Sequence, residues 1–234
     1  MIKEAIILAG GLGTRLRSVI SEVPKCLAPV NGKPFLGCVI NHLQKEGIEK
    51  FIFCLGYKSE MIAEFINIHL STINYQLSTE QQPLGTGGAI KLACSKAVEK
   101  TVLVVNGDTL FKVDINKLMA FHNMCGADCT LSLKPMENFD RYGSVELNKD
   151  YSIKSFKEKS FYEAGLINGG VYALHSKRFS EEKLPQIFSF EKEYLEKYFD
   201  KRRMYGVIQD KYFIDIGIPE DYEKAQKELS NPVS

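Results

Sequence analysis

The chain has almost no net charge, no long hydrophobic run and no basic leader segment. Its 30 lysines and arginines are balanced by 29 acidic residues, so the formal net charge is +1. This balance gives no reason to expect nucleic acid or an anionic membrane as a partner. No apolar run is long enough to span a bilayer, and no basic region followed by an apolar core stands near the N-terminus. We therefore expect a cytoplasmic protein.

Histidine and cysteine are too sparse and too scattered for the common catalytic and metal sites. No Ser-His-Asp order or HExxH sequence occurs, and each histidine lies on an expected helix or near a turn, away from the motifs below: His42, His69, His122 and His175. Six cysteines in a chain this long do not make a disulfide scaffold. Cys125 and Cys129 lack a nearby histidine pair for zinc. Cys26 stands beside Lys25, but a catalytic thiol would need a partner histidine.

Strand-like and helix-like segments alternate along the first half of the chain. Apolar runs at 5–8, 51–55 and 101–105 indicate buried strands, and helical spacing of apolar residues predicts helices over 35–46 and 59–70. Such alternation favours parallel strands joined by right-handed crossovers.

The second half changes pattern before it returns to helices. Short strands at 142–147 and 152–156 predict an antiparallel insertion, and a strand at 127–133 precedes it. Further helices are expected at 89–98, 115–123, 190–201 and 219–229. No linker, repeat or low-complexity segment divides the chain. We expect one α/β domain over 1–234, Rossmann-like, with a mainly parallel central sheet, helices on both faces and a small antiparallel insertion.

A glycine cluster directly follows the first buried strand. Backbone N–H groups in such a loop can turn inward around phosphate oxygens, and Arg15 and Lys25 supply fixed positive charge. A Rossmann loop is excluded because its third glycine would fall at Leu16, and no Gly-Lys-Ser/Thr follows for a Walker loop. An ordinary tight turn with surface cations is the plainer alternative. The candidate phosphate-binding residues are Leu8, Gly10, Gly11, Gly13, Thr14, Arg15 and Lys25.

A carboxylate follows the most strand-like run of the chain. The strand at 101–105 ends at Asn106-Gly107-Asp108, and open α/β sheets bind ligands just past the carboxyl ends of central strands. Asp108 is therefore a candidate Mg²⁺ ligand facing the first loop, with Gly107 beside the nucleotide. Asn-Gly-Asp is also common as plain turn chemistry.

The segment from Leu8 to Leu16, together with Pro24-Lys25, resembles the signature of the sugar-1-phosphate nucleotidyltransferases. Within that family the chain looks most like the D-glycero-α-D-manno-heptose 1-phosphate guanylyltransferases, and the resemblance runs from Ile6 to Tyr222. It implies the nucleotide-diphospho-sugar transferase fold and a Mg²⁺-dependent reaction between GTP and a sugar 1-phosphate. The product would be a GDP-sugar for surface polysaccharide synthesis. A nucleotide-binding half over about 1–133 and a sugar-binding section over about 134–234 follow.

The resemblance also assigns the second glycine-rich loop, 80–89, to the nucleobase. Guanine presents two N–H donors, so the residues that recognise it need hydrogen-bond acceptors, and Glu80 and Gln82 are the available ones. The carboxylate favours guanine over thymine or uracil, although an amide such as Gln82 reads any of them. A solvated polar loop before a helix is the alternative. The remaining candidates here are Pro83, Gly85 and Thr86.

Three further motifs carry the resemblance into the sugar-binding section. Phe156-Lys157-Glu158-Lys159 matches the family's Phe-x-Glu-Lys, in which the glutamate binds sugar hydroxyls and the lysine the sugar phosphate. Without the family, Lys-Glu-Lys is a solvated charge run. Asn168-Gly169 resembles the family's Asn-Ala segment, with glycine in place of alanine. Asp215 takes the place of the second Mg²⁺ ligand, and Tyr142 and Gly143 complete the acceptor candidates.

The expected chemistry needs no histidine, because a sugar 1-phosphate is mostly dianionic at neutral pH. Arg15, Lys25 and Asp108 are the candidate catalytic residues. Two alternatives stay open: the same chemistry with mannose 1-phosphate or another nucleotide and acceptor, and a non-catalytic relative that binds nucleotide-sugar and regulates a partner. A homodimer is compatible with the sequence, which does not decide the oligomeric state.

Overall fold

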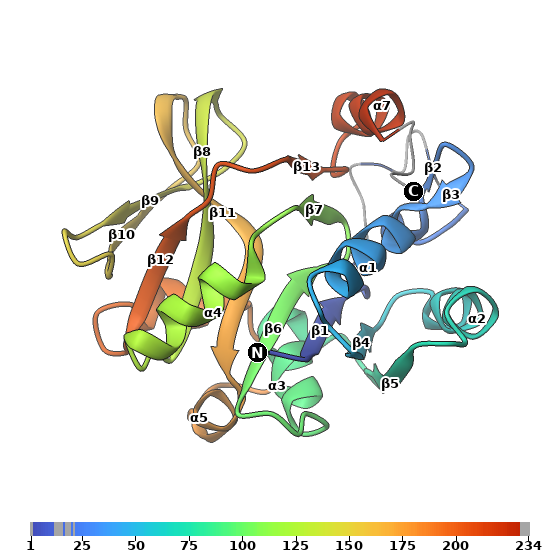
Figure 1. Ribbon diagram of the computed structural model, residues 1–234, viewed down its shortest axis with the longest axis horizontal. Coiled ribbons are helices and arrows are strands. Elements are labelled where there is room, and N and C mark those ends of the chain that lie inside the picture. Colours follow the sequence, from blue (N-terminus) through green and yellow to red (C-terminus); the bar gives the residue numbers. More distant parts are fainter. Residues whose placement is uncertain (1, 12–15, 17–19, 21, 230–234) are drawn as a thin grey trace.

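A computed structural model describes residues 2–11, 16, 20 and 22–229 of the chain (Figure 1). Its strands are β1 (Glu4–Leu8), β2 (Pro29–Val30), β3 (Lys33–Pro34), β4 (Lys50–Leu55), β5 (Asn74–Thr79), β6 (Thr101–Asn106), β7 (Thr109–Phe111), β8 (Cys129–Phe139), β9 (Ser144–Leu147), β10 (Ile153–Lys157), β11 (Tyr162–His175), β12 (Met204–Ile208) and β13 (Phe213–Asp215). Its helices are α1 (Phe35–Lys45), α2 (Ser59–His69), α3 (Gly85–Cys94), α4 (Ile115–Met124), α5 (Ser176–Glu181), α6 (Glu196–Tyr198) and α7 (Pro219–Glu228), with a 3₁₀ turn, η2 (Lys25–Leu27), and a π-helix, η3 (Phe190–Leu195).

A nine-stranded mixed sheet forms the centre of the molecule. Seven strands follow the order β10-β9-β11-β6-β1-β4-β5, and β8 joins through pairs with β11 and β12. The strands β6, β1, β4 and β5 run parallel, whereas β11 is antiparallel to β6, β8 and β9. The predicted α/β fold with an antiparallel section is confirmed. The antiparallel part extends beyond the predicted hairpin to β8 and β11.

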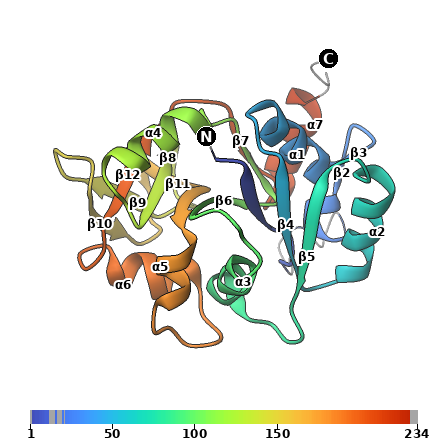
Figure 2. The ribbon, with the colours of Figure 1, turned by 60° about the horizontal axis from the view of Figure 1, so that its bottom comes forward.

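The central strands place alternate side chains in two hydrophobic clusters, one on each face of the sheet. In β1, Ala5 and Ile7 pack in the cluster that includes α1, α2, α4 and α7, whereas Ile6 packs in the cluster with α3, α5 and η3. β4 and β6 alternate in the same way. Figure 2 shows α3 and α5 on one side of the sheet and α1 and α4 on the other. A strand with period-two side chains needs an apolar residue at every position when both faces are covered. This explains the unbroken apolar run at the N-terminus.

Several element boundaries differ from those predicted, for example those of β8 and α3. The strand predicted to end at Leu133 continues to Phe139, and Pro135 pairs with Leu166 of β11. β12 pairs β8 only as far as Leu133, so Pro135 lies where one edge of β8 is open and its missing N–H leaves no partner unsatisfied. The helix predicted from residue 89 begins at Gly85 instead.

Two short strands, β5 and β12, were not predicted from the sequence. β5 lies at the edge of the sheet and carries mostly polar residues, and β12 is a five-residue strand paired only with β8 among the named strands. β5 lacks the continuous apolar run that marks a buried strand, and Gly206 interrupts the apolar run of β12. Among the described residues, none of the helices is both long enough and apolar enough to cross a lipid bilayer.

Candidate active site

The carboxyl ends of β1, β4 and β6 meet at one edge of the sheet, and the predicted nucleotide loops leave from there. The amide of Gly107 donates to the carbonyl of Leu8 at 2.9 Å, and a Cβ on Gly107 would lie 2.9 Å from that oxygen. A Cβ on Gly10 would lie 2.7 Å from the amide nitrogen of Gly56. Glycine is therefore required at both positions by the close approach of neighbouring backbone. Gly13, Thr14 and Arg15 of the first loop lie outside the described residues.

Lys25, Asp108 and Asp215 converge on one point at this edge. The Nζ of Lys25 lies 2.6 Å from Oδ2 of Asp108 and 3.1 Å from Oδ1 of Asp215. The three side chains are 13%, 33% and 26% exposed, so the group is shielded but reachable from solvent. The sequence predicted that two distant acidic residues would meet opposite the first loop. The structure brings them together around a lysine.

Local structure explains why the two carboxylates meet. β6 ends at Asn106, and a tight turn that contains Asp108 leads into β7. β7 pairs antiparallel with β13, with Asp215 opposite Thr109, and the amide of Ile216 donates to the Asp108 carbonyl at 3.1 Å. A Cβ on Gly217 would lie 3.0 Å from Asp215 Oδ1 and 3.2 Å from the Lys25 ammonium. A side chain at residue 217 would therefore press into this group.

The charges of this group are strongly coupled. Burial by itself would lower the pKa of Lys25, but the negative charges of Asp108 and Asp215 outweigh it and raise that pKa. Burial and the neighbouring charge of Asp108 raise the pKa of Asp215, which Lys25 opposes. One ammonium faces two carboxylates, which leaves the group attractive to a further cation.

The donor set fits Mg²⁺. Carboxylate oxygens are its usual protein ligands, and it commonly takes one or two of them together with substrate phosphates and water. The ammonium of Lys25, seated between Asp108 and Asp215, shows that a cation is accommodated there. No group of three or more acidic, histidine or cysteine side chains that could hold a metal occurs within the described ranges. Asp108 and Asp215 would therefore share the ion with the nucleotide.

A cavity of about 560 Å³ opens beside this group. It is lined by Lys25, Asp108 and Asp215 and also by all six residues predicted to bind the acceptor: Tyr142, Gly143, Glu158, Lys159, Asn168 and Gly169. These residues come from the β8–β9 connection, the segment after β10, and β11. One cavity thus joins the candidate metal ligands to the candidate acceptor site.

The amide of Asn168 is held in a fixed orientation at the cavity wall. Its Nδ2 donates to the hydroxyl of Tyr172 at 2.8 Å and lies 3.3 Å from Oε1 of Glu191, while its Oδ1 accepts from the amide of Gly170 at 3.1 Å. Tyr172 is 2% exposed, and burial raises the pKa of its hydroxyl well above the ordinary value. The amide therefore rests on a rigid, buried support.

Gly169 replaces the alanine of the family pattern for a steric reason. A Cβ at this position would lie 2.3 Å from Cδ1 of Phe111, which is closer than real side-chain contacts allow. Phe111 in turn packs edge-to-face on Phe213 at 5.6 Å between ring centroids. The aromatic pair occupies the volume that an alanine methyl would need.

The two lysines beside Glu158 differ in their partners. The Nζ of Lys157 lies 2.5 Å from Oε1 of Glu146, an ion pair at the surface. Lys159 also lines the cavity, where it interacts electrostatically with Glu191. Both lysines line the cavity, but Lys157 is paired with Glu146, whereas Lys159 acts electrostatically on Glu191.

Packing within the protein accounts for the glycines of the second loop. A Cβ on Gly87 would lie 2.1 Å from the ring of Phe188, and a Cβ on Gly85 would lie 2.5 Å from the Phe188 carbonyl. Thr86 Oγ1 accepts from the amide of Phe190 at 2.9 Å. Glu80 Oε2 accepts from the amide of Leu84 at 2.8 Å. The nucleobase role of the loop stays a prediction, and Gln82 and Pro83 are exposed.

Two cavity residues and one ion pair next to Tyr142 have no counterpart among the predicted residues. Asn106 lines the cavity, and its side chain packs against Gly170. Glu191 lines it from η3. Arg141 pairs with Asp221 at 2.5 Å and lies over the ring of Tyr142, 5.5 Å from its centroid. Asn106 stands two residues before Asp108 in the same motif and could have been predicted from it. Glu191 lies in an amphipathic segment that carries no signal of function.

Comparison with known proteins agrees with this geometry. The model of the nucleotidyl transferase family matches residues 4–231. The chain belongs to this family. It is 52% identical, over 97% of its length and 99% of the relative's, to the D-glycero-α-D-manno-heptose 1-phosphate guanylyltransferase of Aneurinibacillus thermoaerophilus. It is 45% identical, over 94% and 96%, to the enzyme of that name from Campylobacter jejuni.

A solved structure shows the same fold. The crystal structure of HddC from Yersinia pseudotuberculosis superposes with a TM-score of 0.87 at 36% identity, covering 97% of this chain and 99% of that one. The same protein was also solved in complex with GMP-PN, with a TM-score of 0.86. The predicted family and the predicted nucleotide-diphospho-sugar transferase fold are confirmed.

Proposed function

We propose that this protein joins GTP and D-glycero-α-D-manno-heptose 1-phosphate to give the GDP-sugar and pyrophosphate, in the synthesis of a surface polysaccharide. The observation that carries the proposal is the single cavity that unites Lys25, Asp108 and Asp215 with the predicted acceptor residues. Family membership and nearly full-length identity to two guanylyltransferases of that name support it.

At the donor end, positive charge and backbone amides bind the triphosphate. Lys25 and Arg15 hold the phosphates, with the amides of the first loop. The Oε2 atom of Glu80 accepts from the amide of Leu84, and its other carboxylate oxygen reads the N–H groups of guanine together with Gln82. The GMP-PN complex of HddC supports a guanine nucleotide as donor.

At the acceptor end, the cavity offers a cationic group for the sugar phosphate and hydrogen-bonding groups for the sugar hydroxyls. Lys159 binds the dianionic phosphate of the sugar. Glu158 and Asn168 bind sugar hydroxyls, since one accepts hydrogen bonds and the other both donates and accepts. The backbone of Gly169 gives the sugar close access, and Tyr142 and Gly143 line the same cavity.

The reaction is a displacement at the α-phosphorus of GTP. An oxygen of the sugar phosphate attacks, a new P–O bond forms, and the bond between the α-phosphorus and the bridging oxygen breaks with its electron pair leaving on pyrophosphate. The attacking oxygen needs no general base, because the second pKa of a phosphate monoester is about 6. The residues align two anions and balance their charge. Asp108 and Asp215 would hold Mg²⁺, which supplies charge neutralisation at phosphate oxygens.

The proposal is tested by incubating the purified protein with each nucleoside triphosphate and with heptose, mannose and glucose 1-phosphates. Pyrophosphate release is the readout. We expect the highest kcat/KM for GTP with the heptose 1-phosphate. Preference for mannose 1-phosphate or for another triphosphate would replace the substrate assignment, and no release with any pair would support a non-catalytic nucleotide-sugar-binding protein.

A further inference from the structure

The cavity contains a carboxylate that the family motifs do not include. Glu191 is the second residue of the π-helix η3, and its Oε1 lies 3.3 Å from Nδ2 of Asn168 and 3.4 Å from the hydroxyl of Tyr172. The side chain lines the cavity and is accessible to solvent, although burial by the surrounding protein raises the pKa of its carboxyl group. It therefore stands beside the amide already assigned to a sugar hydroxyl, with carboxylate lone pairs still available.

Contacts made by the residues before and after Glu191 in the sequence fix its position. The preceding residue, Phe190, is 1% exposed, stacks edge-to-face on Tyr172 at 5.1 Å and donates its amide to Thr86. The amide of Lys192 donates to Oγ of Ser189, which caps the start of η3. A π-helix is rare, and such segments are frequently found at functional sites. Side chains that select a ligand by hydrogen bonding need this kind of rigid support.

The charges around Glu191 suit a polyhydroxylated ligand that carries phosphate at one end. Lys159 lies near enough to interact electrostatically with Glu191, and Lys25 lines the same cavity beside Asp108. A dianionic phosphate would be repelled by Glu191 and attracted by the lysines. Neutral hydroxyl groups of the sugar can donate hydrogen bonds to the Glu191 carboxylate, which already contacts an amide and a phenol.

We propose that Glu191 is a specificity-determining residue that accepts a hydrogen bond from one hydroxyl of the acceptor sugar, next to Asn168. The inference rests on the proposed function, because it assumes that a sugar phosphate occupies this cavity. It adds to the Glu-Lys and Asn-Gly motifs a third sugar-binding group, contributed by η3, whose first residue also donates its amide to Thr86 of the second glycine-rich loop.

The test compares binding of sugar 1-phosphates to the wild-type protein and to Glu191→Ala by calorimetry. The ligands are α-D-mannose 1-phosphate, D-glycero-α-D-manno-heptose 1-phosphate and mannose 1-phosphates lacking one hydroxyl each. For the wild type, we expect the absence of one particular hydroxyl to weaken binding about tenfold, because a hydrogen bond to the charged carboxylate is lost. For Glu191→Ala, the absence of the same hydroxyl should have no effect, because the substitution has already removed that hydrogen bond. Glu181→Ala, a glutamate on α5 that does not line the cavity, is the control.

The outcomes separate the two proposals. If the wild type binds the sugar phosphates and Glu191→Ala keeps the full deoxy-sugar pattern, the inference about Glu191 is wrong while the proposed function stands. If the wild type binds none of them and releases no pyrophosphate, the proposed function fails and the inference falls with it. Glu191→Gln gives a variant that preserves the contact with Asn168, so a folding defect in Glu191→Ala, seen as a lowered Tm, does not hide the result.

Discussion

The ammonium of Lys25 lies 2.6 Å from the carboxylate of Asp108, although 83 positions of the chain separate the two residues. The contact joins the first loop region to the turn after β6, and Asp215 completes it from β13. This relationship converts three separate sequence motifs into one charged centre at the carboxyl edge of the sheet. Open α/β folds place ligand sites at that edge.

Lys25→Gln should abolish most of the activity while the protein stays folded. The substitution removes the charge that faces both carboxylates and, in the proposed reaction, the triphosphate. We expect kcat to fall by about 10²–10³, the usual cost of removing one electrostatic stabiliser from an active site. Lys3→Gln, which breaks an exposed pair with Glu49, should leave kcat unchanged. A Lys25→Gln enzyme with near wild-type kcat would remove this residue from the catalytic group.

Arg141 and Asp221 should act as one unit that positions Tyr142. The Arg141 guanidinium pairs with Asp221 at 2.5 Å and covers the Tyr142 ring, and burial and then the charge of Asp215 raise the pKa of that tyrosine. We expect Arg141→Ala and Asp221→Asn each to lower kcat/KM for the sugar 1-phosphate about fivefold. The double variant should be no worse than either single one, because residues of one network are not additive. Additive losses would show that the two residues act separately.

Gly169→Ala should destabilise the protein. The new methyl group would lie 2.3 Å from the Phe111 ring, and overpacking of this kind costs about 1–3 kcal/mol. Phe111→Leu combined with Gly169→Ala should recover part of the loss. Urea unfolding measures both. Gly37→Ala, whose Cβ would meet its nearest neighbour at 4.0 Å, should not lower stability and serves as the control.

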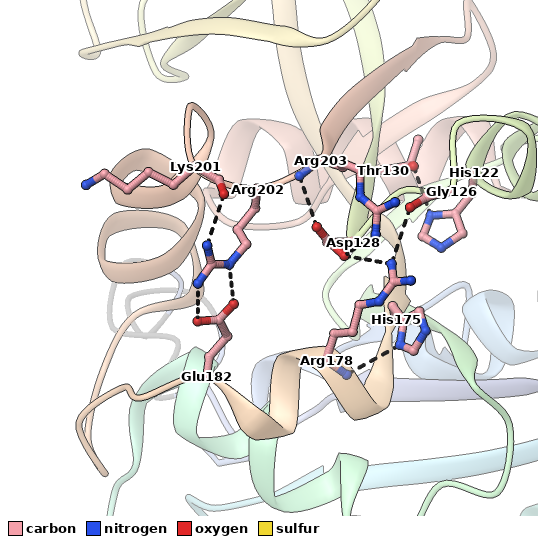
Figure 3. A network of polar contacts seen from close by, with 10 residues as sticks. All are labelled: His122, Gly126, Asp128, Thr130, His175, Arg178, Glu182, Lys201, Arg202 and Arg203. Atoms are coloured by element: carbon pink, nitrogen blue, oxygen red, sulfur yellow. Dashed lines mark hydrogen bonds and ion pairs between the residues drawn. The ribbon is translucent and has the colours of Figure 1, made fainter.

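The stability of the fold should fall in mild acid because of a buried histidine remote from the active site. Figure 3 shows His122 beside Thr130 in a network around Asp128, Arg178 and His175. The Nδ1 of His122 lies 2.9 Å from the Thr130 hydroxyl, and burial, followed by the charge of His175, lowers its pKa to about 4.

In the unfolded chain His122 has a pKa of about 6.5, so the unfolded state binds the proton more readily between pH 6.5 and 4. Stability is therefore complete above this window and declines as the pH falls through it, by about 3 kcal/mol from this group. His122→Gln should flatten that part of the pH profile in urea unfolding, while His69→Gln, at an exposed position, should not. An unchanged slope for His122→Gln would assign the acid sensitivity to other groups.

The position of the candidate site in the fold could be predicted from the sequence, whereas the packing around it could not. Buried strands with apolar residues at every position end at glycines and at Asp108, so their common edge could be inferred before any coordinates. Asp215 required the resemblance to a family, because only the pairing of β13 with β7 brings it to Asp108. That pairing is a long-range contact with no local signal in the chain.

Other features could not be inferred because they depend on what packs against them. Gly85 and Gly87 are needed to admit Phe188, a residue about one hundred positions away. Pro135 continues a strand because its neighbour β12 stops at Ile208, opposite Leu133. Glu191 looks like one of many helix-surface glutamates until Asn168 and Tyr172 are seen beside it. In each case tertiary contacts decide the role of the residue, and local secondary-structure propensity does not predict those contacts.

The proposed metal-dependent reaction is tested most directly by the rate of pyrophosphate release by Asp108→Asn with GTP and heptose 1-phosphate over a titration of Mg²⁺. We predict that chelation stops the wild-type enzyme, that Mg²⁺ restores it, and that Asp108→Asn remains at least about one hundredfold slower at every Mg²⁺ concentration with an unchanged Tm. Asp200→Asn, an exposed turn residue, should behave as the wild type. Near-normal turnover by Asp108→Asn, or turnover of the wild type in excess chelator, would contradict the proposal that Asp108 and Asp215 hold a catalytic Mg²⁺.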